Sequence, residues 1–336
     1  MKFADFNQMV QPAIDQELRS AFETHVPNYP MLREMIAYHM GWVGEGAGTD
    51  AQGKRIRPVL VLLAAAASGG KWQAALPAAA AVEFLHNFSL VHDDIQDQSM
   101  LRRGRPTVWA KWGIAQAINT GDVLFNLSYR ALNRLEETVS IEAAFQSSLA
   151  LQKSCFLLTE GQFLDLLYES RLELPEMDYW KMISGKTAAL ISCCLELGAL
   201  TAGVNPSRQQ SFAALGKQVG LAFQVLDDWL GIWGDAELTG KSTESDLVSG
   251  KKTLPVVFAL EHPGRFAERW KQGKITAGEV SGLAELLKEE GAYQYTLAEA
   301  ERLTNRALAL VDDVSGEAPT GEALKELILV LLNRSK

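Results

Sequence analysis

The segment Phe88-Ser-Leu-Val-His-Asp-Asp-Ile-Gln-Asp97 begins as an apolar helical run and ends in three carboxylates. On a helix, Asp93 and Asp97 lie one turn apart on one face, and Asp94 is rotated by about 100° from that face. Two stacked carboxylates repel each other unless a cation lies between them. An isolated pair of this kind is typical of a solvated helix end, so its meaning depends on its neighbours.

Two other features favour a cation site over a solvated helix end. The segment Leu101-Arg-Arg-Gly-Arg105 follows at once, so positive charge is clustered beside the acids. A second acid pair, Asp227-Asp228, ends another apolar run, Phe223-Gln-Val-Leu226. Carboxylate oxygens with few His or Cys nearby favour Mg²⁺ as the metal, and arginines hold phosphate groups. These patterns predict Mg²⁺ ions that bind a diphosphate.

The composition is that of a globular protein with a large core, since 47% of the 336 residues are apolar and 22% are charged. The net charge of −9 disfavours nucleic acid or an anionic membrane as a partner. Cys155, Cys193 and Cys194 are too few for a disulfide framework and are expected to be buried in a reducing compartment. The N-terminus lacks the apolar segment of a signal peptide, and the apolar run Pro58–Gly70 is too short to span a bilayer. We therefore expect a cytoplasmic protein without stable membrane insertion.

Apolar residues recur with a period close to 3.6, and no alternating strand pattern stands out. Helices are predicted over two segments within 4–43 and then over 59–67, 77–97, 109–137, 141–170, 176–203 and 207–233, followed by several shorter helices in 254–335. Glycines between 231 and 250 mark a long polar loop. No linker separates two differently composed halves, so we predict one all-α domain over 1–336.

A basic cluster precedes the helix that Pro58 opens. Lys54, Arg55 and Arg57 lie where the free N–H groups of a helix N-terminus also favour anions. Taken alone, this cluster fits a solvated basic turn better than a binding site.

Polar side chains also interrupt the apolar helices. Glu83 and His86 form one Glu-x-x-His unit, but a di-iron site needs a second unit and two further glutamates, which we do not find. The polar groups of Glu160–Asp165 fit either a satisfied core network or a cavity wall. Further groups that could reach an anionic ligand are Lys186 and Thr187 after Gly185, Gln224 one turn before Asp227, and Lys241 and Lys251 on the polar loop.

In order and joint spacing, these motifs resemble the trans-type isoprenyl diphosphate synthases (polyprenyl synthetases), most closely the short-chain geranylgeranyl and farnesyl diphosphate synthases. The motifs are Gly-Lys-Arg-Ile-Arg-Pro at 53–58, Asp-Asp-Ile-Gln-Asp at 93–97 followed by Leu-Arg-Arg-Gly-Arg-Pro-Thr, Gly-Lys-Thr at 185–187, Phe-Gln-Val-Leu-Asp-Asp at 223–228 and Gly-Lys-Lys-Thr-Leu-Pro at 250–255. The resemblance implies the isoprenoid synthase fold, an all-α antiparallel helical bundle around a deep central cavity, usually in a homodimer.

The resemblance also implies a role for each candidate residue. Asp93, Asp97 and Asp227 would ligate three Mg²⁺ ions, which Mn²⁺ can replace, and would form the catalytic set together with Lys186. The residues that would hold the allylic diphosphate are Arg102, Lys186, Thr187, Gln224, Lys241 and Lys251. The residues that would hold isopentenyl diphosphate are Lys54, Arg57, His86 and Arg103.

The implied reaction is a head-to-tail (1'-4) condensation. Diphosphate leaves dimethylallyl, geranyl or farnesyl diphosphate, the double bond of isopentenyl diphosphate attacks the allylic cation, and a proton leaves. Phe88 and Ser89, with Leu85 deeper on the helix, would set the length of the all-trans product. One aromatic at Phe88 beside a small Ser89 resembles enzymes that make the C20 product, geranylgeranyl diphosphate, which is the product we expect.

The second acid motif departs from the family pattern, because Gly231 stands where a third carboxylate is usual. Asp235 is the replacement that the sequence suggests. Three alternatives stay open: a farnesyl diphosphate (C15) synthase, a class I terpene cyclase-like enzyme and a non-catalytic regulatory subunit. A cyclase has no isopentenyl diphosphate to hold, and a silent subunit should have lost carboxylates of the first motif, which this chain keeps.

Overall fold

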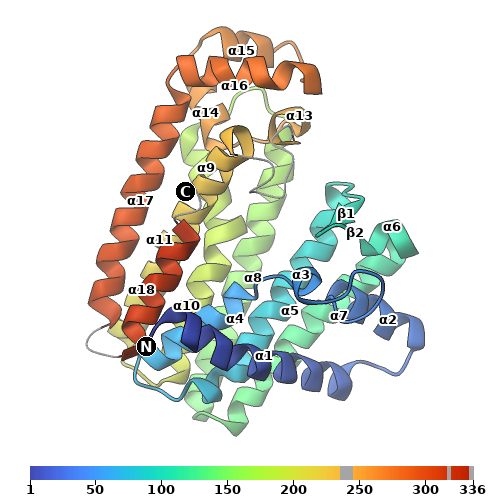
Figure 1. Ribbon diagram of the computed structural model, residues 1–336, viewed down its shortest axis with the longest axis vertical. Coiled ribbons are helices and arrows are strands. Elements are labelled where there is room, and N and C mark those ends of the chain that lie inside the picture. Colours follow the sequence, from blue (N-terminus) through green and yellow to red (C-terminus); the bar gives the residue numbers. More distant parts are fainter. Residues whose placement is uncertain (235–244, 316–318, 333–336) are drawn as a thin grey trace. The chain divides into compact units, whose positions relative to one another are not determined.

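The computed structural model describes residues 1–234, 245–315 and 319–332. Within these ranges the chain is almost entirely helical, which confirms the all-α prediction (Figure 1). The predicted sites Asp235 and Lys241 lie outside the described residues. The chain separates into two compact units, and the predicted single domain over 1–336 stays a prediction. The described residues of the first unit lie within 1–151, 194–209 and 317–323, and those of the second within 152–193, 210–316 and 324–336.

The helices of the first unit follow the predicted order (Figure 1). They are α1 (Phe3–His25), α2 (Pro30–His39), α3 (Thr49–Gln52), α4 (Ile56–Ala67), the 3₁₀ turn η1 (Trp72–Ala75), α5 (Leu76–Gln96), α6 (Val108–Trp112), α7 (Ile114–Asn133), the 3₁₀ turn η2 (Arg134–Glu137) and the start of α8 (Ile141–Glu169). The predicted helix over 109–137 is wrong in its continuity, because Gly113 has a φ of +83° and separates α6 from α7. This left-handed conformation favours glycine, which lacks a Cβ.

Helix α5 forms the centre of the first unit and packs against α1, α4 and α7. Pro77 lies in its first turn, where a missing backbone N–H costs no hydrogen bond. Val82, Phe84 and Leu85 are fully buried. Because α5 is wholly apolar over residues 76–82 and buried along most of its length, the acid motif at its end is carried on a well-packed scaffold.

A two-stranded hairpin follows α5, which sequence periodicity did not predict. Strands β1 (Leu101–Arg102) and β2 (Arg105–Pro106) pair antiparallel through a two-residue loop of Arg103 and Gly104. Both loop residues have positive φ, 52° and 74°, as the tightest hairpin turns require. Strands of two residues are too short to show alternation, which is why the pattern was missed.

The second unit contains the later helices (Figure 1). They are the rest of α8, α9 (Glu176–Ile183), the π-helical turn η3 (Ser184–Ala188), α10 (Ala189–Thr201), which continues into the first unit, α11 (Pro206–Trp233), α13 (Ser245–Ser249), α14 (Leu254–Glu261), α15 (Arg265–Trp270), the 3₁₀ turn η4 (Ala277–Glu279), α16 (Val280–Glu289), α17 (Ala292–Ser315) and α18 (Pro319–Leu332). The first residues of α11 and α18 belong to the first unit. The helices after 254 are all shorter than α8 and α11, as predicted, and the longest of them is α17, whose 24 residues contain no Gly or Pro. Its Tyr295 stacks on Phe258 of α14, with ring centroids 4.5 Å apart.

Two helical stretches, Trp72–Gln96 and Glu176–Thr201, are long and apolar enough to cross a membrane by length and composition. The sequence-based estimate from a single apolar run therefore missed them. Of their most apolar windows, 67% and 78% are buried inside the protein, as in core helices. They are consequently weak evidence for a membrane span. All three cysteines are free and buried, as expected.

Candidate active site

The carboxylates of the first acid motif lie at the C-terminal end of α5. Asp93 is half-buried and Asp97 is exposed, and the Asp97 backbone N–H donates to the Asp93 carbonyl at 2.8 Å, so the two lie one turn apart. Among the described residues, no group of three or more His, Cys, Asp or Glu side chains is arranged to hold a metal ion. Two carboxylates still fit Mg²⁺, which commonly binds one or two of them and completes its shell with water and phosphate. The donor set therefore suits an ion that is shared with a diphosphate.

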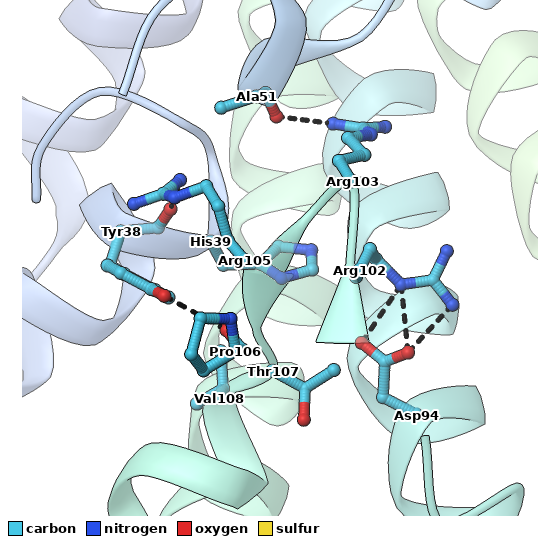
Figure 2. Close-up of a pocket in the computed structure, with 10 residues that line it drawn as sticks. All are labelled: Tyr38, His39, Ala51, Asp94, Arg102, Arg103, Arg105, Pro106, Thr107 and Val108. Atoms are coloured by element: carbon cyan, nitrogen blue, oxygen red, sulfur yellow. Dashed lines mark hydrogen bonds and ion pairs between the residues drawn. The ribbon is translucent and has the colours of Figure 1, made fainter. Parts of the chain in front are cut away.

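The middle carboxylate of this motif has a different task. Asp94 is 2% exposed and accepts from Arg102, with Nε at 2.8 and 2.9 Å from its two oxygens and Nη2 at 2.7 Å from Oδ1 (Figure 2). Burial raises the pKa of Asp94, while the Arg102 guanidinium opposes this shift. A bidentate pair of this kind fixes the plane of the guanidinium. Asp94 thus orients Arg102, a predicted ligand of the allylic diphosphate.

The arginines of the hairpin point in different directions, as the β-turn requires (Figure 2). Arg103 donates from Nη1 to the carbonyl of Ala51 at 2.7 Å, and burial lowers its pKa. Arg105 is a structural residue: it donates to three backbone carbonyls, those of Tyr38, Val43 and Glu45, at 2.8–2.9 Å. The three arginines of one short motif therefore serve three purposes.

The basic cluster before α4 is divided in the same way. Arg55 is buried and donates from Nη2 to Asp15 and to Gln52, both at 2.8 Å. Its φ of +47° places it in the left-handed region, which turns its side chain away from those of its neighbours. Lys54 is exposed and Arg57 is half-buried. Lys54 and Arg57, rather than Arg55, are therefore placed to meet an external anion.

Arg57 and His86 lie together. The Arg57 Nη1 is 3.2 Å from the His86 Nε2, and because a guanidinium only donates, the imidazole accepts at Nε2 and carries its proton on Nδ1. Burial, and then the neighbouring Arg57 and Arg103, hold the pKa of His86 well below its usual range. His86 is therefore a neutral side chain that presents an N–H donor without adding charge.

Sequence reasoning missed the carboxylate that balances this basic group. Glu83 is 3% exposed, and Asn87 Nδ2 donates to its Oε1 at 3.1 Å. Burial raises the pKa of Glu83, and the positive charges of Arg57, Arg55 and Arg103 oppose this shift. The Glu-x-x-His spacing, which is also typical of a metal site, is the only sequence signal that places Glu83 near His86.

A small pocket adjoins Arg102 and Arg103 (Figure 2). Its volume of about 20 Å³ is room for about one water molecule, so it does not hold a substrate. His39 lines it, and burial together with the nearby arginines lowers the pKa of this imidazole to about 3. His39 was not predicted, because an isolated His on an apolar helix carries no functional signal.

In the second unit, Lys186 and Thr187 lie on the π-helical turn η3. The backbone of α8 lies very close to this turn. A Cβ added at Gly161 of α8 would lie 2.6 Å from the carbonyl carbon of Gly185 and 2.7 Å from the Cα of Lys186. Turns of this type often occur at functional sites. The Lys186 Nζ forms an ion pair with Asp165 of α8, which is buried. Asp165 is therefore the member of the 160–165 segment that supports Lys186, whereas Glu160 pairs with Lys181.

The second acid pair is also divided. Asp227 is half-buried, whereas Asp228 is 4% exposed and accepts three hydrogen bonds, from Tyr179, Gln224 and the Leu254 backbone N–H. Burial raises the pKa of Asp228 to about 7, and these three donors oppose the shift. Asp228 is committed to the protein interior, so Asp227 is the member of the pair that suits a metal ion.

The absent third carboxylate has a structural counterpart. A Cβ added at Gly231 would collide with the carboxylate of Asp246 in α13. Asp246 thus supplies negative charge where the motif lacks it, and sequence spacing did not suggest this residue. Lys251 is half-buried, and its neighbour Lys252 is buried with Nζ donating to the carbonyls of Glu169 and Gly250.

The predicted chain-length residues lie together on α5. Leu85 is fully buried, and the Ser89 hydroxyl donates to the His86 carbonyl at 2.8 Å. The Phe88 ring contacts Phe125 of α7, with centroids 5.2 Å apart, and Phe125 in turn contacts Tyr129. Phe88 is therefore one member of an aromatic cluster that sequence reasoning had not extended to α7.

Comparison with known proteins identifies similar chains. A family model described as polyprenyl synthetase matches residues 47–287. The chain is 39% identical over 315 residues to the (2E,6E)-farnesyl diphosphate synthase of Mycobacterium tuberculosis (strain ATCC 25618 / H37Rv), covering 91% of this chain and 87% of that protein. It is 41% identical over 305 residues to the geranylgeranyl diphosphate synthase of the same strain, covering 88% and 86%.

Solved structures agree with these relatives. The polyprenyl synthetase from Streptomyces coelicolor A3(2) has a TM-score of 0.87 with this chain at 33% identity, and the match covers 98% of this chain and 99% of that one. The names of the two sequence relatives differ in the product, so similarity does not select one product length.

Proposed function

Because the chain belongs to the polyprenyl synthetase family, we propose that it condenses isopentenyl diphosphate with an allylic diphosphate to give geranylgeranyl diphosphate. Its relatives are prenyl diphosphate synthases, so the chain is a prenyltransferase of the short-chain type. The observation that carries the proposal is the preassembled pair of Arg57 and neutral His86, whose charge the buried Glu83 carboxylate balances. A diphosphate needs such a set of N–H donors, and a cyclase with one substrate does not need a second set.

The predicted residues are proposed to divide between the two substrates and the metal ions. Lys54, Arg57, His86 and Arg103, all in the first unit, would hold isopentenyl diphosphate. Lys186, Thr187, Gln224 and Lys251 of the second unit would hold the allylic diphosphate, with Arg102 oriented by Asp94 and with Lys241. Members of the family use a divalent metal, and Asp93, Asp97 and Asp227 would hold three Mg²⁺ ions here. Such ions supply positive charge beside the departing diphosphate.

Separate effects on the two substrates test this division. We expect Arg57→Ala to raise the KM for isopentenyl diphosphate about tenfold or more, because the loss of one hydrogen bond to a charged group costs about 1.5–3 kcal/mol. Lys186→Ala should instead raise the KM for the allylic substrate. Steady-state kinetics with each substrate varied in turn measures both constants.

Exposed Lys153 of α8 provides a control, since Lys153→Ala removes a positive charge outside the predicted sites and should change neither constant. Equal changes of both KM values in both site variants would contradict the division. An enzyme that ionises the allylic substrate without consuming isopentenyl diphosphate would contradict the proposed reaction itself.

Product length is expected to depend on Phe88. We expect Phe88→Ala to lengthen the product by at least one isoprene unit, because removal of the ring opens space beside Phe125. Mass spectrometry of the products formed from each allylic starter measures this change. A C15 product from the unaltered enzyme would favour the farnesyl diphosphate alternative. If Phe88→Ala kept the parental product while Leu85→Ala lengthened it, the side chain that limits product length would lie deeper along α5 than Phe88.

A homodimer is part of the proposal. Large apolar side chains are exposed along one face of α8 at spacings of four and seven residues: Phe145, Leu149, Phe156, Phe163 and Leu167. Several large apolar side chains exposed along one helix face are typical of a subunit interface. Sedimentation equilibrium tests the dimer, and a single species at the 36.8 kDa chain mass would contradict it.

We also propose that the protein acts in the cytoplasm.

A further inference from the structure

A chain of buried hydrogen bonds connects Tyr179 of α9 to Thr187 of η3. Tyr179 is fully buried, and its hydroxyl donates to Asp228 Oδ2 at 2.8 Å. Oδ2 also accepts from the Leu254 N–H at 2.9 Å, while Oδ1 accepts from Gln224 Nε2 at 2.8 Å. Gln224 Oε1 then accepts from the Thr187 hydroxyl at 2.6 Å. All of these residues belong to the second unit.

The chemistry of this chain determines which way the Gln224 amide faces. In its ionised form the Asp228 carboxylate only accepts, and the amide nitrogen of Gln224 faces it and donates to Oδ1. The amide oxygen must then face Thr187, whose hydroxyl hydrogen is directed toward it. One N–H of Gln224 and the lone pairs of Thr187 remain for other partners. The orientation of both side chains thus depends on how Asp228 is held.

Tyr179 is the side chain that holds Asp228 from the opposite side. A carboxylate turns readily about its last torsion, because terminal torsions of this kind have broad minima. The Tyr179 hydroxyl and the Leu254 N–H both bind Oδ2, and together they hold the carboxylate plane with Oδ1 toward Gln224. Without the hydroxyl, a single donor remains on Oδ2, and Oδ1 loses its fixed direction.

We propose that Tyr179 is a positioning residue for binding of the allylic diphosphate, acting through Asp228 on Gln224 and Thr187. This inference rests on the proposed function, in which Gln224 and Thr187 contact that group. Tyr179 touches no substrate itself. Its hydroxyl sets the direction of Gln224 and Thr187, which contact the substrate. Loss of the hydroxyl therefore weakens binding of the allylic diphosphate and leaves binding of isopentenyl diphosphate unchanged.

The test is the Tyr179→Phe variant, which keeps the ring and removes the hydroxyl. We expect the KM for the allylic diphosphate to rise about five- to tenfold and the KM for isopentenyl diphosphate to stay within about twofold. Tyr295→Phe is the matched control. The Tyr295 hydroxyl contacts both oxygens of Glu176 at 2.7 and 2.8 Å, but Tyr295 does not belong to the series of hydrogen bonds from Tyr179 to Thr187. It should lower the melting temperature without changing either KM.

Two further variants sharpen the test. In a Tyr179→Phe/Gln224→Ala double variant, the allylic KM should equal that of Gln224→Ala alone, because both changes act on one contact. Asp228→Asn places an amide nitrogen among three donors and forces Gln224 to reverse, so it should give the same selective effect even if Tyr179→Phe does not fold. Additive effects, or equal changes of both KM values, would overturn the inference while the enzyme stays active. A wild-type enzyme without prenyl transfer would overturn the proposed function as well.

Discussion

An Asp93→Asn enzyme is expected to turn over at least about 100-fold more slowly than the unaltered enzyme, with a melting temperature within a few degrees of it. The amide has nearly the same size as the carboxylate, and Asp93 lies in the last turn of α5, after the buried apolar part of the helix. Folding should therefore be retained. Turnover should be lost because the negative charge that attracts the metal is gone.

Initial rates at saturating Mg²⁺ measure the effect on turnover, and thermal unfolding without metal measures the effect on folding. A second readout is calorimetric titration of Mg²⁺ into the protein with inorganic diphosphate, in which Asp93→Asn should bind more weakly. Asp122→Asn on neighbouring α7 removes an exposed carboxylate outside the predicted site and serves as the control. Near-native turnover of Asp93→Asn would mean that Asp93 is not a metal ligand.

Gly161→Ala is expected to be the most damaging exchange of one small residue for another in the second unit. The added Cβ would lie 2.6 Å from the carbonyl carbon of Gly185 and 2.7 Å from the Cα of Lys186. Because both atoms belong to the backbone, the turn η3 must move. We expect a loss of about 1–3 kcal/mol in the free energy of unfolding and a fall in turnover of about 100-fold, since a displacement of about 1 Å at a binding group can cost that much.

Gly282→Ala in α16 is the control for this exchange. A Cβ there meets no atom within 4 Å, so alanine should raise the free energy of unfolding by up to about 1 kcal/mol. Urea unfolding and steady-state rates on both variants provide the comparison. A Gly161→Ala enzyme with native stability and turnover would show that the approach of α8 to η3 is not needed for the site.

The features that the sequence predicted correctly are those set by residues close together in the chain. Apolar residues with a period near 3.6, and the prolines and glycines that end them, predicted the order of the main helices and the placement of the acid motif at the end of α5. The order and spacing of the motifs predicted the family. Local signals failed at Gly113, where a positive φ interrupts a predicted helix.

Residue type and spacing by themselves determined that this chain is helical and that it carries two acid pairs and a basic motif, and the order of these motifs resembles that of the polyprenyl synthetases. Only the tertiary structure decided which member of each motif is available for a ligand. Asp228 and Arg55 are buried, whereas Asp227 and Arg57 are half-buried. Neighbours in sequence share their chemistry, but the rotation of about 100° per residue along α11 and the φ of +47° at Arg55 send them to different surroundings. Burial and the partners found there, which can come from distant parts of the chain, then decide whether a charge stabilises the fold or remains for a substrate.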